Sequence, residues 1–356
     1  MLEPDNTTDW SAVAVTIKQL GVDHGFQQTG ITDTELDTAE TYLKQWLSEK
    51  QQGDMQWMAI HGDKRSRPAM LVPDTIRIIT VRMDYLPPDC EQMQLILDDP
   101  SRAYVSRYAL GRDYHKLMRK RLQKLASELE NMVGEFGYRI FVDSAPVMEK
   151  PLAEKSGLGW IGKHTNLLNK QNGSWFFLGE IYTDMPLPID EPAQSHCGDC
   201  QACIDICPTK AITAPYQLDA RLCISYLTIE HQGAIPIELR PQMGNRIYGC
   251  DDCQLCCPWN RFADFTAEKD FHPRNKLDDI SLLELFDWDE ATFLSRTEGS
   301  AIRRIGHERW LRNIAVALGN CKSDQQHIVE TLESRRQNQS ELVLEHIDWA
   351  IERLSR

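Results

Sequence analysis

Cysteines recur at two-residue gaps in Cys197-Gly-Asp-Cys200-Gln-Ala-Cys203-Ile-Asp-Ile-Cys207-Pro208 and again in Cys250-Asp-Asp-Cys253-Gln-Leu-Cys256-Cys257-Pro258. The first run has the spacing of bacterial ferredoxins, in which three cysteines hold one cluster and the cysteine before proline ligates a second. Such gaps put successive thiolates on the same side of a turning loop, as a four-iron cubane requires. The two runs therefore predict a ferredoxin-like unit with two 4Fe-4S clusters.

The number of cysteines in this window exceeds what two cubanes need. Eight thiolates are required, and nine cysteines lie between 197 and 257, because Cys223 separates the two runs. Cys257-Pro258 mirrors Cys207-Pro208, and in ferredoxins the cysteine before proline ligates the other cluster. Cys257 is therefore expected to join the first run and Cys207 the second. The first cluster is then expected on Cys197, Cys200, Cys203 and Cys257, and the second on Cys207, Cys250, Cys253 and either Cys223 or Cys256. Spacing favours Cys256, but adjacent cysteines point in divergent directions.

Two other uses of these cysteines are less compatible with the pattern. Structural zinc also binds paired Cys-x-x-Cys motifs, but three cysteines at strict two-residue gaps before Cys-Pro favour clusters. Disulfides are not expected, because a chain of 356 residues does not need them for stability and its N-terminus does not resemble a signal peptide. Eleven cysteines without a secretory segment indicate a reducing cytoplasm.

Composition restricts the possible partners. A length of 356 residues allows two or three domains, and no apolar run reaches the roughly 20 residues needed to cross a bilayer. The formal net charge of -14 argues against nonspecific coating of nucleic acid. Positive charge is nevertheless concentrated locally, because residues 102–124 contain eight basic side chains and one acidic one. A second basic group comprises Arg303, Arg304, Arg309 and Arg312.

The first 190 residues mix helical and strand patterns and predict an α+β domain with α/β-like character. Helices are expected over 9–26, after a capping box at 32–35, and from about residue 114 to a stop at Gly134. Strands are expected over 75–81, 138–142 and 174–183. Asp143 follows the second of these, at the end of the strand where ligands of open α/β sheets bind. Burial there would raise the pKa of Asp143 and suit it to general acid catalysis.

After the cysteine window the pattern becomes entirely helical. Apolar periodicity predicts helices over 281–286, 289–293, 309–320, 325–335 and 341–354. The last two are expected to form an antiparallel pair that resembles a HEAT-like repeat. The predicted domains are therefore 1–190, 191–263 and 264–356.

Five motifs together resemble the epoxyqueuosine reductase family: Ser106-Arg-Tyr-Ala-Leu-Gly-Arg-Asp-Tyr-His-Lys116, Val142-Asp-Ser-Ala-Pro146, Gly159-Trp-Ile-Gly-Lys163, Cys223-Ile-Ser-Tyr-Leu-Thr-Ile-Glu230 and Ile305-Gly-His-Glu-Arg-Trp-Leu-Arg-Asn313. They extend from about residue 60 to 320, most of the chain. The resemblance implies a cobalamin-dependent enzyme with two 4Fe-4S clusters that removes the epoxide oxygen of epoxyqueuosine at the wobble position of transfer RNA.

The resemblance also implies a role for each part of the chain. Domain 1–190 would bind cobalamin, and the C-terminal domain would hold the anticodon stem-loop through Arg303, Arg304, Arg309 and Arg312 and through basic residues near 112–121. Asp143 would be the proton donor, and the implied cofactor contacts are Ser106, Asp143, Lys163 and Ser225. Cys223 would complete the second cluster, leaving Cys256 spare. A flavodoxin or ferredoxin would donate electrons to a cytoplasmic monomer.

One near-motif conflicts with this expectation. Asp113-Tyr-His115-Lys-Leu-Met118 approaches the Asp-x-His-x-x-Gly sequence that supplies a histidine below cobalt, but the glycine is missing. The family resemblance implies a cofactor without such a histidine, so His115 is expected to be structural. Two rival functions remain open at this stage: a corrinoid reductase acting on a small molecule, such as a halogenated compound, and a noncatalytic electron carrier.

Overall fold

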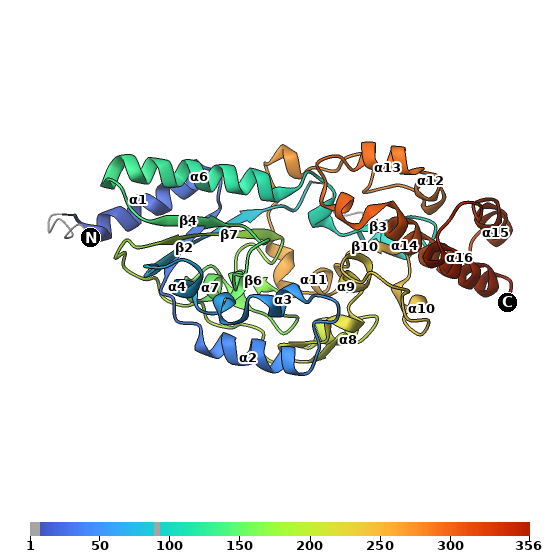
Figure 1. Cartoon of the computed structure of the whole chain (residues 1–356), viewed down its shortest axis with the longest axis horizontal. Coiled ribbons are helices and arrows are strands. Elements are labelled where there is room, and N and C mark those ends of the chain that lie inside the picture. The colour runs from blue at the N-terminus through green and yellow to red at the C-terminus, as the bar shows by residue number, and fades with distance from the viewer. Residues whose placement is uncertain (1–7, 89–92) are drawn as a thin grey trace.

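A four-stranded sheet forms the centre of the N-terminal half of the molecule, which a computed structural model describes for residues 8–88 and 93–356 (Figure 1). Its strands are β1 (Gln28–Thr32), β2 (Arg77–Asp84), β7 (Phe176–Thr183) and β4 (Tyr138–Phe141), in the spatial order β1-β2-β7-β4. Each neighbouring pair is antiparallel. The α+β prediction is therefore confirmed at this level, and the α/β-like character expected for this domain is wrong.

The three predicted strands are confirmed, whereas β1 was not anticipated. β2 and β7 are almost entirely buried, as expected for β-branched and aromatic runs covered on both faces. β1 is a short edge strand interrupted by Gly30, which weakens its sequence signal. Glycine is needed there because a Cβ would lie 2.2 Å from the carbonyl oxygen of Ser156.

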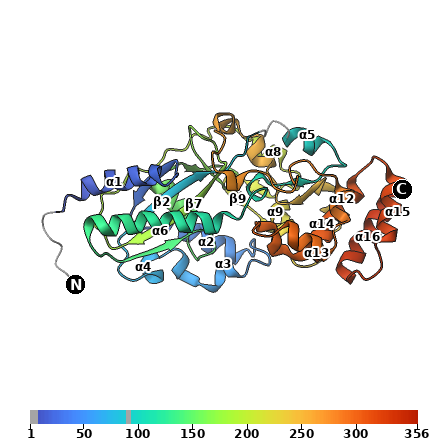
Figure 2. The same ribbon diagram turned by 90° about the horizontal axis from the view of Figure 1, so that it is seen from above.

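Helices cover both faces of this sheet. On one face α1 (Trp10–Asp23) and α6 (Tyr114–Val133) lie side by side (Figure 2). The opposite side carries α7 (Glu149–Lys155), α4 (Pro68–Leu71) and α2 (Asp37–Ser48) (Figure 1). Shorter elements in this half are α3 (Trp57–Ile60), α5 (Met93–Asp98), β3 (Tyr104–Val105), β5 (Trp160–Ile161) and β6 (Leu167–Leu168). Both faces of the sheet are thus shielded from water.

The predicted helix ends are partly confirmed. Asp9 caps α1 by accepting hydrogen bonds from the Ser11 and Ala12 backbone N–H groups. α6 ends at Gly134, whose φ of 86° favours glycine. The capping box at 32–35 is wrong, because α2 begins at Asp37 without a side-chain cap.

The cysteine window consists of short elements joined by loops. These are α8 (Ala202–Ile206), β8 (Ile212–Ala214), β9 (Gln217–Leu218), α9 (Ile224–Ile229), α10 (Arg240–Met243), β10 (Arg246–Tyr248) and α11 (Asp252–Leu255). α8 and α11, which each carry a cysteine, pack against one another. Single 3-10 turns occur at Gly62–Arg65, Arg107–Ala109, Ala220–Leu222, Pro258–Phe262, Lys269–Phe271 and Ala301–Ile305.

The C-terminal part is helical, as predicted. It contains α12 (Leu282–Phe286), α13 (Glu290–Arg296), α14 (Gly306–Asn320), α15 (Gln325–Ser334) and α16 (Glu341–Leu354). α14 is buried over most of its length and packs mainly against α16. Among the described residues, no helix is long and apolar enough to cross a membrane.

The hydrophobic cores do not follow the predicted domain limits. The core around α14 also contains Ala103, Val105, Ala109 and Leu110 from the N-terminal region. β3, from that same region, pairs in parallel with β10 of the cysteine window. Residues 103–110 therefore connect all three predicted domains through buried contacts.

Candidate active site and cluster-binding cysteines

Two neighbouring cavities separate the cysteines into two sets. A cavity of about 400 Å³ is lined by four of them, Cys207, Cys223, Cys250 and Cys253. A second cavity of about 250 Å³ is lined by Cys197, Cys200, Cys203 and Cys257. Cys256 lines neither of these two cavities, and its Sγ lies 3.6 Å from the carbonyl oxygen of Cys253. Each cavity is thus lined by cysteines of both sequence runs: Cys207 lies with Cys250 and Cys253, and Cys257 lies with Cys197, Cys200 and Cys203.

Asp251 anchors the loop that carries the second cysteine run. Its carboxylate is buried and accepts hydrogen bonds from the Tyr104 hydroxyl at 2.9 Å, the Ser106 hydroxyl at 2.6 Å and the Arg107 backbone N–H at 2.9 Å. Gly249 precedes this run with a φ of 70°, and a Cβ there would lie 2.5 Å from the Ser106 Cβ. Cys250 and Cys253 are therefore fixed relative to β3.

The lining of the larger cavity also contains aromatic and apolar side chains. It includes Tyr85, Tyr108, Tyr114, Phe176, Phe177, Leu167 and Leu178. Ser106 and Ser225, two of the predicted cofactor contacts, also line it. Mostly apolar walls with a few polar groups suit a large organic cofactor. Cys207, Cys223, Cys250 and Cys253 line this same cavity.

Lys163 does not reach the larger cavity. It lines the smaller one, where its Nζ donates hydrogen bonds to the carbonyl oxygens of Gly198 at 2.7 Å and Cys200 at 2.9 Å. The predicted cofactor contact of Lys163 therefore has no counterpart in the lining of the larger cavity. Its buried ammonium instead holds the loop of the first cysteine run.

Asp143 lies directly after β4, beside two residues of the larger cavity, Tyr114 and Glu149. β4 is antiparallel to β7 and its last residue, Phe141, pairs with Glu180, so the chain beyond β4 continues toward the start of β7, where Phe176 and Phe177 contribute to the cavity. About half of the Asp143 side chain is exposed, 51%. Asp143 is not itself a lining residue of this cavity. Asp143 therefore lies at the edge of the larger cavity.

A short chain of hydrogen bonds connects Asp143 to the C-terminal helices. The His115 Nε2 lies 3.1 Å from Asp143 Oδ2, and the His115 Nδ1 lies 2.5 Å from Asp113 Oδ1. Arg304 donates to Asp113 Oδ2 at 2.6 Å. His115 is buried and stacks on Tyr114, with ring centroids 4.2 Å apart. Its ring nitrogens therefore face an acid on each side, and a guanidinium nitrogen of Arg304 also lies 3.0 Å from Nδ1.

The pKa values of His115 and Asp143 shift in opposite directions. Burial lowers the pKa of His115, but its hydrogen bonds with Asp113 and Asp143 outweigh burial and raise that pKa to about 8. Burial raises the pKa of Asp143, but the bond with His115 and its positive charge bring that pKa below the usual value. The predicted rise for Asp143 is thus wrong, because the sequence did not reveal its histidine partner. At neutral pH the pair holds one proton, on His115.

Two further acids lie on the inner side of Asp143. Glu149 Oε1 accepts the Asp143 backbone N–H at 2.6 Å, and burial together with the charge of Asp143 raises the pKa of Glu149 to about 8. Glu180 on β7 is completely buried, and burial and the nearby Glu149 and Asp143 raise its pKa well above the usual value. Neither residue was singled out from the sequence. Glu180 could have been suspected as the one acid inside the strand Phe176–Thr183.

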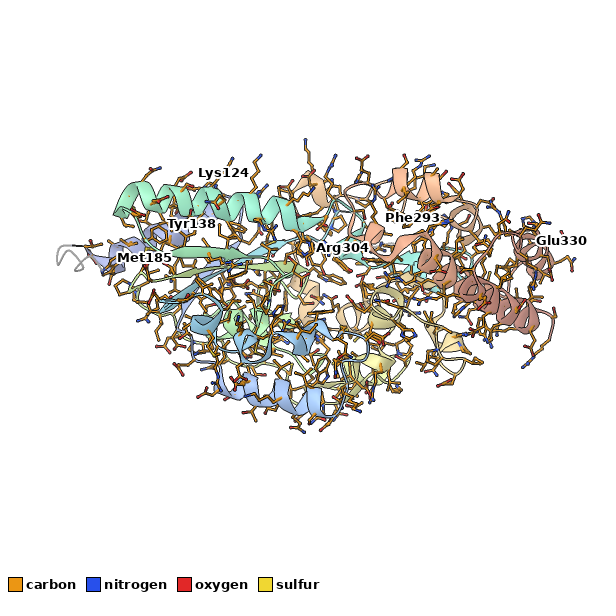
Figure 3. All side chains as sticks on the ribbon, in the orientation of Figure 1. Lys124, Tyr138, Met185, Phe293, Arg304 and Glu330 are labelled. Carbon is orange, nitrogen blue, oxygen red and sulfur yellow. The ribbon has the colours of Figure 1, made fainter. Side chains whose placement is uncertain are left out.

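The four predicted arginines divide into two exposed and two enclosed residues. Arg303 and Arg304 are exposed, and Arg304 lies near the centre of the molecule, between the sheet and the C-terminal helices (Figure 3). Arg309 donates to the backbone oxygens of Ile305, Ile229 and Arg304. Arg312 is fully buried and donates to the backbone oxygens of Leu227, His231 and Gly233. A phosphate contact by Arg312 is therefore wrong, because its guanidinium joins α14 to the loop after α9.

The basic residues predicted near 112–121 lie mostly on the exposed side of α6. Arg112, Lys116, Arg119 and Lys120 are exposed, and Lys124 continues the same side of the helix (Figure 3). Arg121 differs, because it is half-buried and pairs with Glu268. This surface begins at Asp113, so it adjoins the hydrogen-bonded chain described above.

Family models match two parts of the chain. Residues 65–144 match the model described as "Epoxyqueuosine reductase QueG, DUF1730", and residues 196–260 match the "4Fe-4S double cluster binding domain". The first range contains Ser106, His115 and Asp143, and the second contains all nine cysteines of the window.

Similar proteins cover nearly the whole chain. An epoxyqueuosine reductase of Xanthomonas campestris is 60% identical over 351 residues, which are 99% of this chain and 98% of that protein. The enzyme of the same name from Escherichia coli is 58% identical over 343 residues, 96% of this chain and 90% of that protein.

Solved structures agree with this assignment. An epoxyqueuosine reductase crystallised with an epoxyqueuosine-modified tRNA-Tyr stem loop matches with a TM-score of 0.87 and 26% identity, covering 97% of this chain and 91% of that one. The Bacillus subtilis epoxyqueuosine reductase, in a structure with its catalytic aspartate loop swung out of the active site, matches with a TM-score of 0.85 and 26% identity, covering 96% of this chain and 90% of that one. The chain belongs to the epoxyqueuosine reductase family.

Proposed function

We propose that this protein reduces epoxyqueuosine to queuosine in transfer RNA, with electrons passing through two 4Fe-4S clusters. The carrying observation is that the cavity lined by four thiols also contacts Tyr114 and Glu149, the neighbours of Asp143. Electron supply and a proton-donating group thus meet at one place. The proposal is further supported by the named relatives and by the stem loop bound to a similar enzyme.

The cysteines are assigned to the clusters by the cavity that they line. We assign Cys197, Cys200, Cys203 and Cys257 to one cluster and Cys207, Cys223, Cys250 and Cys253 to the other, with Cys256 spare. Cys200 is exposed, so the first cluster is the natural entry point for electrons from a flavodoxin or ferredoxin. The second cluster would then be the donor next to the larger cavity.

Cobalamin is the proposed occupant of the larger cavity. Ser106 and Ser225 would contact it, and the aromatic wall including Tyr85, Tyr108 and Phe177 would pack on it. When bound, this cofactor supplies a strongly reducing, nucleophilic cobalt centre for breaking the carbon–oxygen bond. Asp143 at the edge of the cavity would face the substrate above the cofactor.

The protein's own contribution is to deliver protons. Converting an epoxide to an alkene breaks two carbon–oxygen bonds, consumes two electrons and two protons, and releases the oxygen as water. We assign Asp143 as the acid that delivers one of these two protons to the oxygen, drawn from His115 through their 3.1 Å contact, and water supplies the second proton. Asp113 fixes the His115 ring and supports its positive charge. His115 therefore has a proton-transfer role instead of the structural role expected from sequence.

The substrate RNA is proposed to lie over the junction between α6 and the C-terminal helices. Arg303, Arg304 and Lys116 are exposed, and Arg304 pairs with Asp113 beside His115; these three side chains would contact phosphates. The domain limits 1–190, 191–263 and 264–356, the HEAT-like arrangement of the last domain, the cytoplasmic location and the monomeric state remain part of this proposal.

The proposed reaction can be tested directly. The reconstituted protein is incubated without oxygen with cobalamin, a low-potential reductant and epoxyqueuosine-containing tRNA, and the nucleosides are then analysed. Queuosine is expected to replace epoxyqueuosine. Absence of queuosine with both clusters present and cobalamin bound would overturn the proposal.

The single-turnover rate is expected to fall as pH rises through about 8. His115 has a raised pKa, so it keeps its proton below this value and loses it above. Well above pH 8 the rate should drop about tenfold per pH unit, while tRNA binding stays constant. The measurement is a pH profile of single turnover with saturating enzyme, and a flat profile up to pH 9.5 would contradict the assignment.

Replacing Arg303 with alanine is expected to weaken tRNA binding at every salt concentration. Loss of one phosphate contact should reduce the slope of log affinity against log salt by about 1. Filter binding or fluorescence anisotropy from 50 to 300 mM salt would measure this. Arg356→Ala, an exposed arginine at the far end of α16, is the matched control and should leave the slope unchanged. Equal slopes for both variants would remove Arg303 from the RNA surface.

A further inference from the structure

The backbone of Asp143 adopts a conformation that its side chain disfavours. Its φ of 51° lies in the left-handed region, which residues with a Cβ adopt uncommonly, although aspartate tolerates it better than most. The following residues form tight local hydrogen bonds, Ser144 N–H to the Val142 oxygen at 2.6 Å and Ala145 N–H to the Asp143 oxygen at 2.7 Å. Such a strained turn persists only where its surroundings hold it in place.

Glu149, six residues further along the chain, restrains this turn. It is the first residue of α7, and its Oε1 accepts the Asp143 backbone N–H at 2.6 Å. α7 is itself rigidly placed, because Leu152 and Ala153 are completely buried and the helix packs against β2 and β7. The hydrogen bond thus connects the strained residue to a fixed helix.

Glu180 interacts with both Glu149 and Asp143. The side chain is completely buried, and neither carboxyl oxygen has a hydrogen-bond partner among the described residues. A carboxylate without partners is very costly to bury, so Glu180 holds its proton. Burial and the charge of Asp143 favour the protonated form of Glu149 and outweigh the opposite effect of the nearby Lys150, His115 and Arg65. The surroundings favour a neutral Glu149, whose carbonyl oxygen can accept a hydrogen bond without repelling the carboxylate of Asp143.

We propose that Glu149 is a positioning residue that holds the Asp143 turn in its catalytic conformation through the Asp143 backbone N–H. This inference rests on the proposed role of Asp143 as the acid. A neutral carboxyl and an amide offer the same carbonyl acceptor, so glutamine should replace glutamate in this task, whereas alanine should not. Ionisation of Glu149 should weaken the restraint, because a carboxylate would face the negative charge of Asp143.

The same helix offers a matched control. Glu154 also accepts a backbone N–H, that of Ile161 in β5, at 2.7 Å. It does not line the larger cavity. Glu154→Ala therefore removes a hydrogen bond from an α7 glutamate to a backbone N–H at a different place.

Hydrogen–deuterium exchange of the full-length, cluster-loaded protein without tRNA tests the restraint itself. Glu149→Ala should speed exchange of the Asp143 amide by about tenfold, as expected for losing one hydrogen bond. Glu149→Gln should stay within about threefold of wild type, and Glu154→Ala should accelerate Ile161 instead. Unchanged exchange at Asp143 in Glu149→Ala would overturn the proposal. Unchanged exchange in the strands β2 and β7 shows that the variant is folded.

The pH dependence of exchange supplies a second readout. After correction for intrinsic exchange, raising the pH from 7 to 9 should release the Asp143 amide in wild type, because Glu149 ionises near pH 8. Glu149→Gln cannot ionise and should keep its protection at both pH values. Loss of protection in Glu149→Gln to the same extent as in wild type would contradict the role of the carboxyl charge.

Single turnover then connects the restraint to the reaction. Glu149→Ala should slow conversion of epoxyqueuosine by about 100-fold, because a small displacement of a reacting group has this effect. Its affinity for tRNA should not change, and Glu149→Gln should restore most of the rate. If Asp143→Asn remains active, the acid assignment fails, but the exchange results still decide whether Glu149 restrains the turn. The two failures are therefore distinguishable.

Discussion

Asp143→Asn is expected to reduce single-turnover conversion of epoxyqueuosine by about 10²–10⁴-fold, the usual contribution of a general acid. Asparagine has nearly the same shape and can still contact His115, but it cannot pass a proton to the epoxide oxygen. Removing the negative charge also withdraws one of the two acids that support the proton on His115. The measurement is rapid-quench kinetics with nucleoside analysis.

The controls for this variant separate chemistry from assembly. Iron content, cobalamin absorption and tRNA affinity should equal those of wild type, because Asp143 is not a cysteine ligand and half of its side chain is exposed. Ser144→Ala changes an exposed neighbour in the same turn and should retain the rate. A rate for Asp143→Asn within tenfold of wild type would refute the assignment of the acid.

Cys223→Ser is expected to remove about half of the iron, from about eight to about four atoms per chain, and to abolish turnover. Serine does not supply a thiolate, so the cluster next to the larger cavity would lose one of its four ligands. Electrons could then no longer reach the substrate side. Iron quantitation and the visible absorption of the anaerobically reconstituted protein measure the loss.

Cys256→Ser is the matched control for this experiment. Cys256 belongs to the second cysteine run but lines neither cavity, so its variant should keep about eight irons and its activity. The reverse result, with iron lost in Cys256→Ser and retained in Cys223→Ser, would exclude the proposed ligand set. Equal losses in both variants would also contradict it, because only one of the two can complete the second cluster.

Arg312 illustrates where sequence reasoning failed. Its position near Arg303, Arg304 and Arg309 in a basic group indicated an RNA-binding surface, but helical geometry distributes neighbouring residues around the helix. Arg303 and Arg304 precede α14 and are exposed, whereas Arg312 on α14 faces inward and satisfies backbone oxygens. Sequence gives the charge of a side chain but not the direction in which the fold points it.

His115 illustrates a different limit. The sequence indicated a helix from about residue 114 and an acid at Asp143, but His115 and Asp143 are 28 residues apart in the chain. Only the packing of α6 against β4 and β7 brings the imidazole to the carboxylate. The same contact reversed the predicted pKa shift of Asp143, since a charged partner outweighs burial.

The sequence by itself determined the features that depend on local spacing. These are the two cysteine runs, the main helices and strands, the turn that carries Asp143 and the family to which the chain belongs. Short-range geometry decides such features, because periodicity, caps and ligand gaps are properties of neighbouring residues.

Tertiary structure alone decided which distant groups meet. It made the sheet antiparallel, divided the cysteines between two cavities, paired His115 with Asp143, and placed Glu149 and Glu180 behind the acid. The physical reason is that burial and electrostatic interaction depend on distances in space, and residues far apart in the chain acquire those distances only when the hydrophobic cores pack.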